Sequence, residues 1–155
     1  MTGRARVKRE AMPVPRERDE QAQLFRWAAV LQSTVPDLAM LHSIPNGGGL
    51  GGGFAKNKGM VLSLIRGGMR KGYPDVGLDV AVSPFHGLRI EMKRTKGGDL
   101  RDADQADWHA RLRAHGYRVE MCEGWIPAVR VLAEYLRPVL SARQHATMIG
   151  SIPGC

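Results

Sequence analysis

Three charged side chains on two neighbouring extended segments could act together on a phosphate ester. The stretch 73–93 reads YPDVGLDVAVSPFHGLRIEMK, with Asp75 at the start of its first apolar run and the triplet Glu91, Met92 and Lys93 in the second. Side chains alternate between the faces of a strand, so Glu91 and Lys93 project together while Met92 points into apolar packing. Two carboxylates offer hard oxygen ligands to Mg²⁺ or Mn²⁺, and a lysine ammonium beside them can hold a water or offset phosphate charge.

The elements that must position these groups are two antiparallel strands. Ser83, Pro84 and Gly87 lie between two runs rich in Val, Leu and Ile, which is the pattern of strands joined by a short loop. Folding this hairpin would bring Asp75 back beside Glu91. The sequence therefore predicts a site for cutting a phosphodiester bond, and the competing interpretation of the triplet is a structural Glu to Lys ion pair.

The rest of the chain predicts a mixed α/β layer structure in which helices flank a small central sheet. Apolar spacing and turn residues divide the chain into a flexible basic tail over 1–15, one folded domain over 16–137 and a loosely attached C-terminal tail over 138–155. We expect helices over about 16–32, 55–66, 102–115 and onward from 124, and additional strands over 38–44 and 117–122.

Charge indicates a polyanionic partner. The 155 residues carry a formal net charge of +8, which draws a protein to nucleic acid or to anionic membrane surfaces. No apolar run is long enough to cross a bilayer and the N-terminus lacks the apolar centre of a secretory signal, so we expect a cytoplasmic protein with no membrane partner. The basic residues expected to capture DNA are Arg66, Arg70, Lys71, Arg94 and Lys96.

A glycine-rich segment over 47–53 has two interpretations. Its six glycines and Leu50 could form a loop whose amides grip phosphate, or a flexible surface loop. The spacing GxxxxGK[ST] is missing, because Lys56 and Lys58 are out of register. We therefore expect no nucleotide cofactor.

Five segments, in order and spacing, resemble the stand-alone VRR-NUC branch of the PD-(D/E)XK nuclease superfamily, found in phages and bacteria. They are HSIPNGGG, GYPDVGL, LRIEMKR, DADQADWHARLRAHGYRVEMCEGW and AVRVLAEYL, and the resemblance spans roughly residues 17–137. It implies a restriction-endonuclease-like core. The glycine-rich segment is longer than the family leads us to expect before GYPD, which bears on how substrate enters.

The resemblance also implies roles for individual residues. Asp75, Glu91 and the backbone carbonyl of Met92 would be metal ligands, and Lys93 would position the attacking water. Gln105, in the fourth segment, matches the glutamine that this branch uses beside its active site. A glutamate of the first helix commonly completes such sites, and it would be Glu20, with Glu17 as the alternative.

The function implied is that of a Mg²⁺- or Mn²⁺-dependent, structure-selective endodeoxyribonuclease. Stand-alone members are associated with symmetric dimers that cleave four-way junctions, so the specific expectation is a homodimeric Holliday-junction resolvase acting on branched DNA near the nucleoid of a bacterial or phage-infected cell. The alternatives are a general, flap-cutting or nicking DNA nuclease, and a catalytically silent DNA-binding module.

Overall fold

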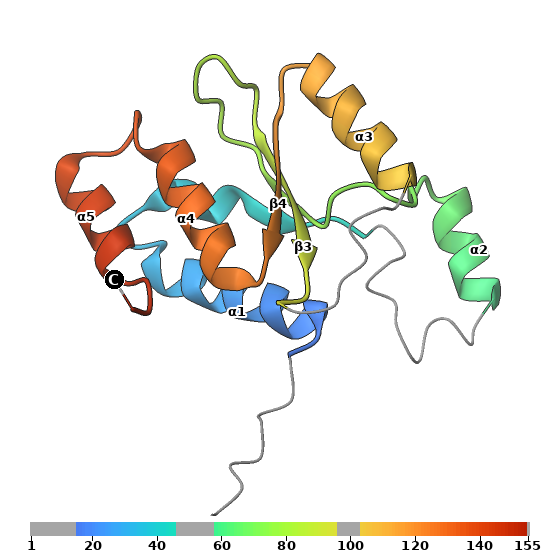
Figure 1. Cartoon of the computed structure of the whole chain (residues 1–155), viewed down its shortest axis with the longest axis horizontal. Helices are drawn as coiled ribbons and strands as arrows, with labels where there is room; N and C mark the ends of the chain where they lie inside the picture. Colours follow the sequence, from blue (N-terminus) through green and yellow to red (C-terminus); the bar gives the residue numbers. More distant parts are fainter. Residues whose placement is uncertain (1–14, 46–57, 96–102, 155) are drawn as a thin grey trace, which may run out of the picture.

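The computed structural model describes residues 15–45, 58–95 and 103–154. Within these ranges the chain forms a four-stranded sheet, five α-helices and one 3₁₀ helix (Figure 1). The strands are β1 (Leu41–Ser43), β2 (Val76–Leu78), β3 (Leu88–Lys93) and β4 (Arg118–Glu123). The helices are α1 (Glu17–Leu31), η1 (Pro36–Met40, 3₁₀), α2 (Lys58–Arg66), α3 (Ala103–Ala114), α4 (Trp125–Leu136) and α5 (Ala142–Gly150).

The sheet is mixed, as the sequence predicts. Its spatial order is β1-β2-β3-β4, with antiparallel pairing of β1 to β2 and of β2 to β3. β3 and β4 are parallel, and α3 makes the crossover that a parallel pair requires. The expected hairpin is therefore confirmed, and the expected strand over 117–122 is β4.

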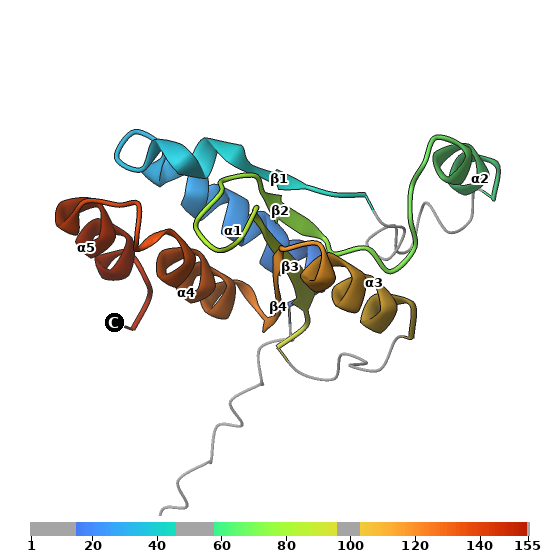
Figure 2. The ribbon, with the colours of Figure 1, turned by 90° about the horizontal axis from the view of Figure 1, so that it is seen from above.

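The hydrophobic core lies on the face of the sheet that α1 and α4 cover, and α5 packs outside α4 (Figure 2). The even-numbered residues of β3, Leu88, Ile90 and Met92, point into this core and are at most 1% exposed. The odd-numbered residues of the same strand therefore project from the opposite face, where α3 lies. This separation of an apolar face from a polar face is what allows charged side chains to gather on β3.

The expected strand over 38–44 is only partly formed. Residues Pro36–Met40 make the 3₁₀ helix η1, and β1 is limited to Leu41–Ser43. Proline at the first turn favours a helical start, because its fixed φ suits the helix and its missing N–H would have no partner there.

The C-terminal segment differs from the loosely attached tail that we expected. Ser141 and Gln144 form a reciprocal capping box at the start of α5. Met148 is fully buried, Ile152 is 3% exposed, and Trp27 donates a hydrogen bond of 2.8 Å to Ser151. The expectation was wrong because the apolar spacing from Met148 to Ile152 is a single helical turn, too short a signal to stand out in the sequence.

Among the helices of the described ranges, none has both the length and the apolar character needed to cross a membrane.

Candidate active site

The β2–β3 hairpin brings Asp75 beside Glu91. Val76 pairs with Ile90, so extending this antiparallel register by one residue sets Asp75 opposite Glu91 on the same face. The Asp75 carboxylate accepts a hydrogen bond of 2.8 Å from the backbone N–H of Met92. Its backbone carbonyl accepts one of 2.7 Å from Ile44, beyond the end of β1. Contacts from both neighbouring segments thus fix the position of Asp75.

Glu91 and Lys93 project from β3 toward α3, as the alternation predicts. The Lys93 Nζ lies 3.2 Å from Glu91 Oε1, and the two side chains are 8% and 2% exposed. Gln105 of α3 joins them: its amide oxygen accepts a bond of 2.7 Å from Lys93, and its amide nitrogen donates to Glu91 Oε1. The glutamine therefore holds the acid and the base of the triplet in one hydrogen-bonded group.

One oxygen of this group lacks a hydrogen-bond partner among the described residues. Glu91 Oε2 is buried, and no group in the described part of the chain donates a hydrogen bond to it. Burial, and after it the nearby charge of Asp75, raise the pKa of the Glu91 carboxyl from 4.5 to about 8, although Lys93 acts in the opposite direction. A buried carboxylate beside a second carboxylate is costly unless a cation compensates the charge. The orphaned oxygen thus fits a divalent cation between Glu91 and Asp75.

The donor set for such a cation is small. In the ranges that the structure describes, no cluster of three or more His, Cys, Asp and Glu side chains is arranged to hold a metal ion. Asp75 and Glu91 supply two carboxylates, so a backbone carbonyl, waters and substrate oxygens would have to complete the shell. Mg²⁺ sites are commonly built in this way, because Mg²⁺ keeps several waters and takes only one or two protein carboxylates.

The first helix offers two glutamates in different environments. Glu20 is 5% exposed, and its two carboxylate oxygens accept hydrogen bonds of 2.9 Å from the Thr95 hydroxyl and 3.0 Å from the backbone N–H of Trp125. It therefore caps the N-terminus of α4, where a negative charge is favourable. Glu17, one turn earlier, is half-buried, and its charge contributes to the raised pKa of Glu91. In the structure, Glu20 therefore stabilises the start of α4, whereas the negative charge of Glu17 acts on Glu91.

The basic residues expected to capture DNA lie at the edges of this site. Arg66 at the end of α2, Arg70 after it and Arg94 after β3 are exposed. Lys71 is exposed as well, but it forms an ion pair of 2.8 Å with Asp104 of α3. Lys96, the glycine-rich segment 47–53 and most of the basic N-terminal tail lie outside the described residues.

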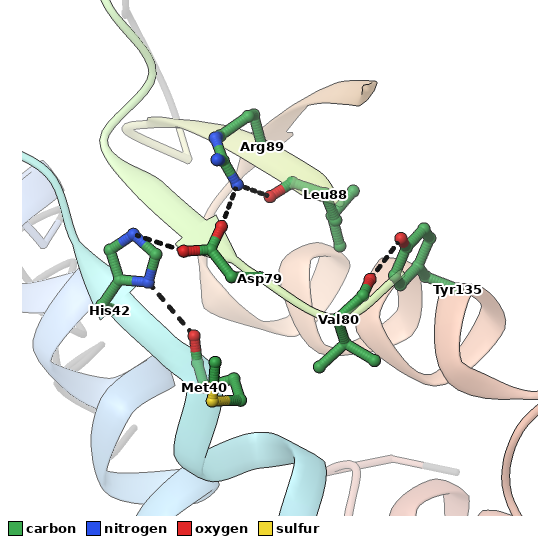
Figure 3. Close-up of polar contacts among 7 residues, drawn as sticks. All are labelled: Met40, His42, Asp79, Val80, Leu88, Arg89 and Tyr135. Carbon is green, nitrogen blue, oxygen red and sulfur yellow. Dashed lines mark hydrogen bonds and ion pairs between the residues drawn. The ribbon is translucent and has the colours of Figure 1, made fainter. Parts of the chain in front are cut away.

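A second polar group on the same face of the sheet was missed by sequence reasoning. Arg89 lies two residues before Glu91 on β3, and its guanidinium contacts Asp79 at 2.9 Å and the Leu88 carbonyl at 3.0 Å (Figure 3). The His42 ring lies 3.9 Å from Asp79 and sits over Gly77, where a Cβ atom would come within 2.7 Å of it. The two-residue period from Glu91 was the available signal for Arg89.

His109 is a further buried group near the site. It lies one helical turn after Gln105 on α3 and is 6% exposed. Burial lowers the pKa of its imidazole, and the positive charges of Arg113 and Lys93 lower it further. His109 therefore stays neutral at neutral pH and adds no positive charge beside Lys93.

The fold matches that of a known structure. A solved chain described as "VRR_NUC domain protein" superposes with a TM-score of 0.61 and 21% sequence identity, over 81% of this chain and 91% of that chain. No protein-family model matches the sequence, and no curated protein matches it either. The expected architecture, an α/β fold with a small central mixed sheet flanked by helices, is thereby confirmed.

Proposed function

We propose that this protein is a divalent-metal-dependent, structure-selective DNA endonuclease. The observation that carries the proposal is the buried, unpartnered Oε2 of Glu91, held beside Asp75 and Lys93 on one face of the sheet. The fold shared with a VRR_NUC domain protein and the net charge of +8 support the same conclusion.

The metal-holding groups in this proposal are the carboxylates of Asp75 and Glu91 and the backbone carbonyl of Met92. Glu17 is the better candidate for the first-helix carboxylate, because both oxygens of Glu20 already accept hydrogen bonds. A bound Mg²⁺ or Mn²⁺ would supply Lewis acidity toward the phosphate and the attacking water.

Lys93 acts on the attacking water and the phosphate, and Gln105 holds Lys93 in position. The Lys93 ammonium, fixed by Glu91 and Gln105, orients the water and stabilises negative charge that develops on the phosphate in the transition state. The water oxygen forms a bond to phosphorus and releases a proton to solvent, the bond from phosphorus to the 3′ oxygen breaks, and that oxygen takes a proton from solvent. The products are a 5′-phosphate and a 3′-hydroxyl.

Substrate capture depends on the exposed cations around the site, Arg66, Arg70 and Arg94, with Lys71 and Lys96 beside them. Each phosphate contact releases counterions, so DNA binding falls steeply as salt rises. The more specific form of the proposal is a homodimer that resolves four-way junctions, since a two-fold axis would present two sites to a branched substrate.

The test is a cleavage assay with the full chain, in Mg²⁺ or Mn²⁺, on labelled four-way junctions, flaps, nicked duplex and linear duplex. Metal-dependent cuts that Lys93→Ala and Asp75→Ala both abolish, without loss of DNA binding, are the expected result. Symmetric paired cuts confined to junctions support resolution, whereas cuts on flaps or plain duplex support a general, flap-cutting or nicking nuclease. DNA binding without cleavage of any substrate would support the alternative of a catalytically silent DNA-binding module.

A further inference from the structure

Helix α2 stands apart from the sheet and the other helices. In both views it lies beyond the N-terminal end of α3, away from α1 and α4 (Figures 1 and 2). Leu62 and Ile65 are 47% and 49% exposed, and Arg66 is exposed beside them. Ile65 and Arg66 lie three and four positions after Leu62, so both are on the side of the helix that Leu62 occupies. α2 therefore presents an apolar surface with a positive charge at its edge, which we call the α2 face.

The charged residues of the segment that contains α2 all have one sign. Residues 58–74 include Lys58, Arg66, Arg70 and Lys71 but no Asp or Glu. An exposed apolar surface within a purely basic segment fits a partner that combines negative charge with accessible apolar faces. Nucleic acid offers both where its bases are unstacked, because every base has a π-face and every nucleotide carries a phosphate.

The segment that follows α2 is attached to the candidate active site. Gly72 adopts φ +77° and packs so closely on α3 that a Cβ atom would lie 2.8 Å from the backbone of Asp104. Trp108 donates a hydrogen bond of 3.1 Å to the Lys71 carbonyl, and the rings of Tyr73 and Trp108 meet edge to face at 5.0 Å. These contacts fix the chain beside α3 just before it enters β2.

The attachment has a consequence for substrate geometry. Asp104 precedes Gln105 in sequence, and the attached segment 71–74 leads directly into Asp75. The segment that follows α2 is therefore attached to α3, which carries Gln105, and it leads into Asp75. A DNA strand whose phosphate reaches Asp75 and Glu91 would have its neighbouring nucleotides near the α2 face.

We infer that the α2 face binds unstacked bases at a DNA branch point and thereby selects branched over linear substrates. Leu62 and Ile65 pack against the exposed faces of bases at the branch, in the way that apolar wedges contact opened base steps. Arg66 and Arg70 hold the phosphates on either side. This role rests on the proposed function, and the feature of the DNA that the enzyme would recognise is the unstacked bases at the branch point.

A second copy of this chain is the competing occupant. A two-fold contact through the α2 face would bring the basic segments of two copies together, and like charges in an interface are unfavourable. Residues 58–74 contain no acidic side chain that could compensate them. The charge pattern therefore favours DNA.

The test compares the double variant Leu62→Gln/Ile65→Gln with wild type. Glutamine is a good helix former and both positions are about half exposed, so thermal unfolding should match wild type within a few degrees. A matched control is Val139→Gln, an equally exposed apolar residue after α4. One assay measures kcat/KM on a four-way junction, a flap and a linear duplex. A second assay titrates protein, in EDTA, into DNA that carries 2-aminopurine at the branch, and it measures the change in 2-aminopurine fluorescence on binding.

The expected result is a loss of at least about 10-fold in kcat/KM on branched DNA, with linear duplex changed less than about 2-fold. The 2-aminopurine response should be lost as well, and Val139→Gln should behave as wild type. Equal activity of the double variant on all substrates with an unchanged 2-aminopurine response would overturn the inference. So would a uniform loss on all substrates together with a shift from dimer to monomer in light scattering, which would assign the face to a second copy.

The outcomes separate this inference from the proposed function. If wild type cleaves no substrate in any metal, the nuclease proposal fails, and the fluorescence titration in EDTA still tests the α2 face. If wild type cleaves with metal and the double variant keeps its branch selectivity, the nuclease proposal stands and the role of the α2 face is refuted.

Discussion

Replacing Glu91 by glutamine should stabilise the metal-free protein, and the gain should depend on pH. Burial and the charge of Asp75 raise the pKa of Glu91 from 4.5 to about 8. The folded protein thus holds this proton more tightly than the unfolded chain, and wild-type stability falls as pH rises from about 4.5 to about 8. A difference of about 3.5 pH units corresponds to about 5 kcal/mol. Glu91→Gln removes the ionisation while its amide oxygen can still accept hydrogen bonds from Gln105 and Lys93.

Urea unfolding in EDTA at pH 5, 6.5 and 8 measures this effect for wild type and variant. The stability gained by Glu91→Gln should be about 1 kcal/mol at pH 5 and should approach about 4 kcal/mol at pH 8. Adding Mg²⁺ at pH 8, at about 100 times its dissociation constant, should restore about 3 kcal/mol to wild type and none to the variant. If the stability difference between the two proteins changes by less than about 1 kcal/mol from pH 5 to pH 8, the view that Lys93 does not fully compensate the buried charge of Glu91 is refuted.

Four further substitutions test neighbouring contacts. Gln105→Ala removes the hydrogen bonds to Glu91 and Lys93. Cleavage assays should show that activity falls by about 10- to 100-fold, and the free energy of unfolding should change little. Glu20→Ala removes the cap of α4 and should lower the free energy of unfolding in urea by about 2 kcal/mol. Glu17→Ala should leave stability within about 0.5 kcal/mol of wild type and should reduce metal-dependent cleavage. The reverse pattern would assign the site glutamate to Glu20. Tyr135→Phe removes a buried hydroxyl that donates to the Val80 carbonyl at 2.7 Å, and thermal unfolding should show a loss of about 1–2 kcal/mol; an unchanged midpoint would mean that water replaces this bond.

The hairpin at the centre of the site could be predicted from the sequence. Alternation over Leu88–Lys93 gives the face of each side chain, because successive residues of a strand must point to opposite sides. The turn residues after Val82 fix the direction of return, so the meeting of Asp75 and Glu91 follows from local geometry. The first helix follows equally well from the spacing of Leu24, Ala28 and Leu31.

Residues on separate elements were harder to place. Which side of α1 faces the sheet is clear from its apolar residues, but Glu17 and Glu20 lie one turn apart, and the packing of α4 decided that Glu20 caps a helix. The attachment of Lys71 and Gly72 to Asp104 of α3 crosses more than thirty residues of sequence, and no periodic pattern marks it.

The sequence by itself determined the chemistry of the candidate site, because residue type and a two-residue period bring an acid, a second acid and an amine to one face of a hairpin. Only the tertiary structure decided the environment of those groups: the burial of Glu91, the bridge made by Gln105, the capping role of Glu20 and the position of α2. The physical reason is the range of the forces involved. Backbone sterics and alternation act over a few residues and can be read along the chain, whereas desolvation and helix packing depend on which distant segments come together.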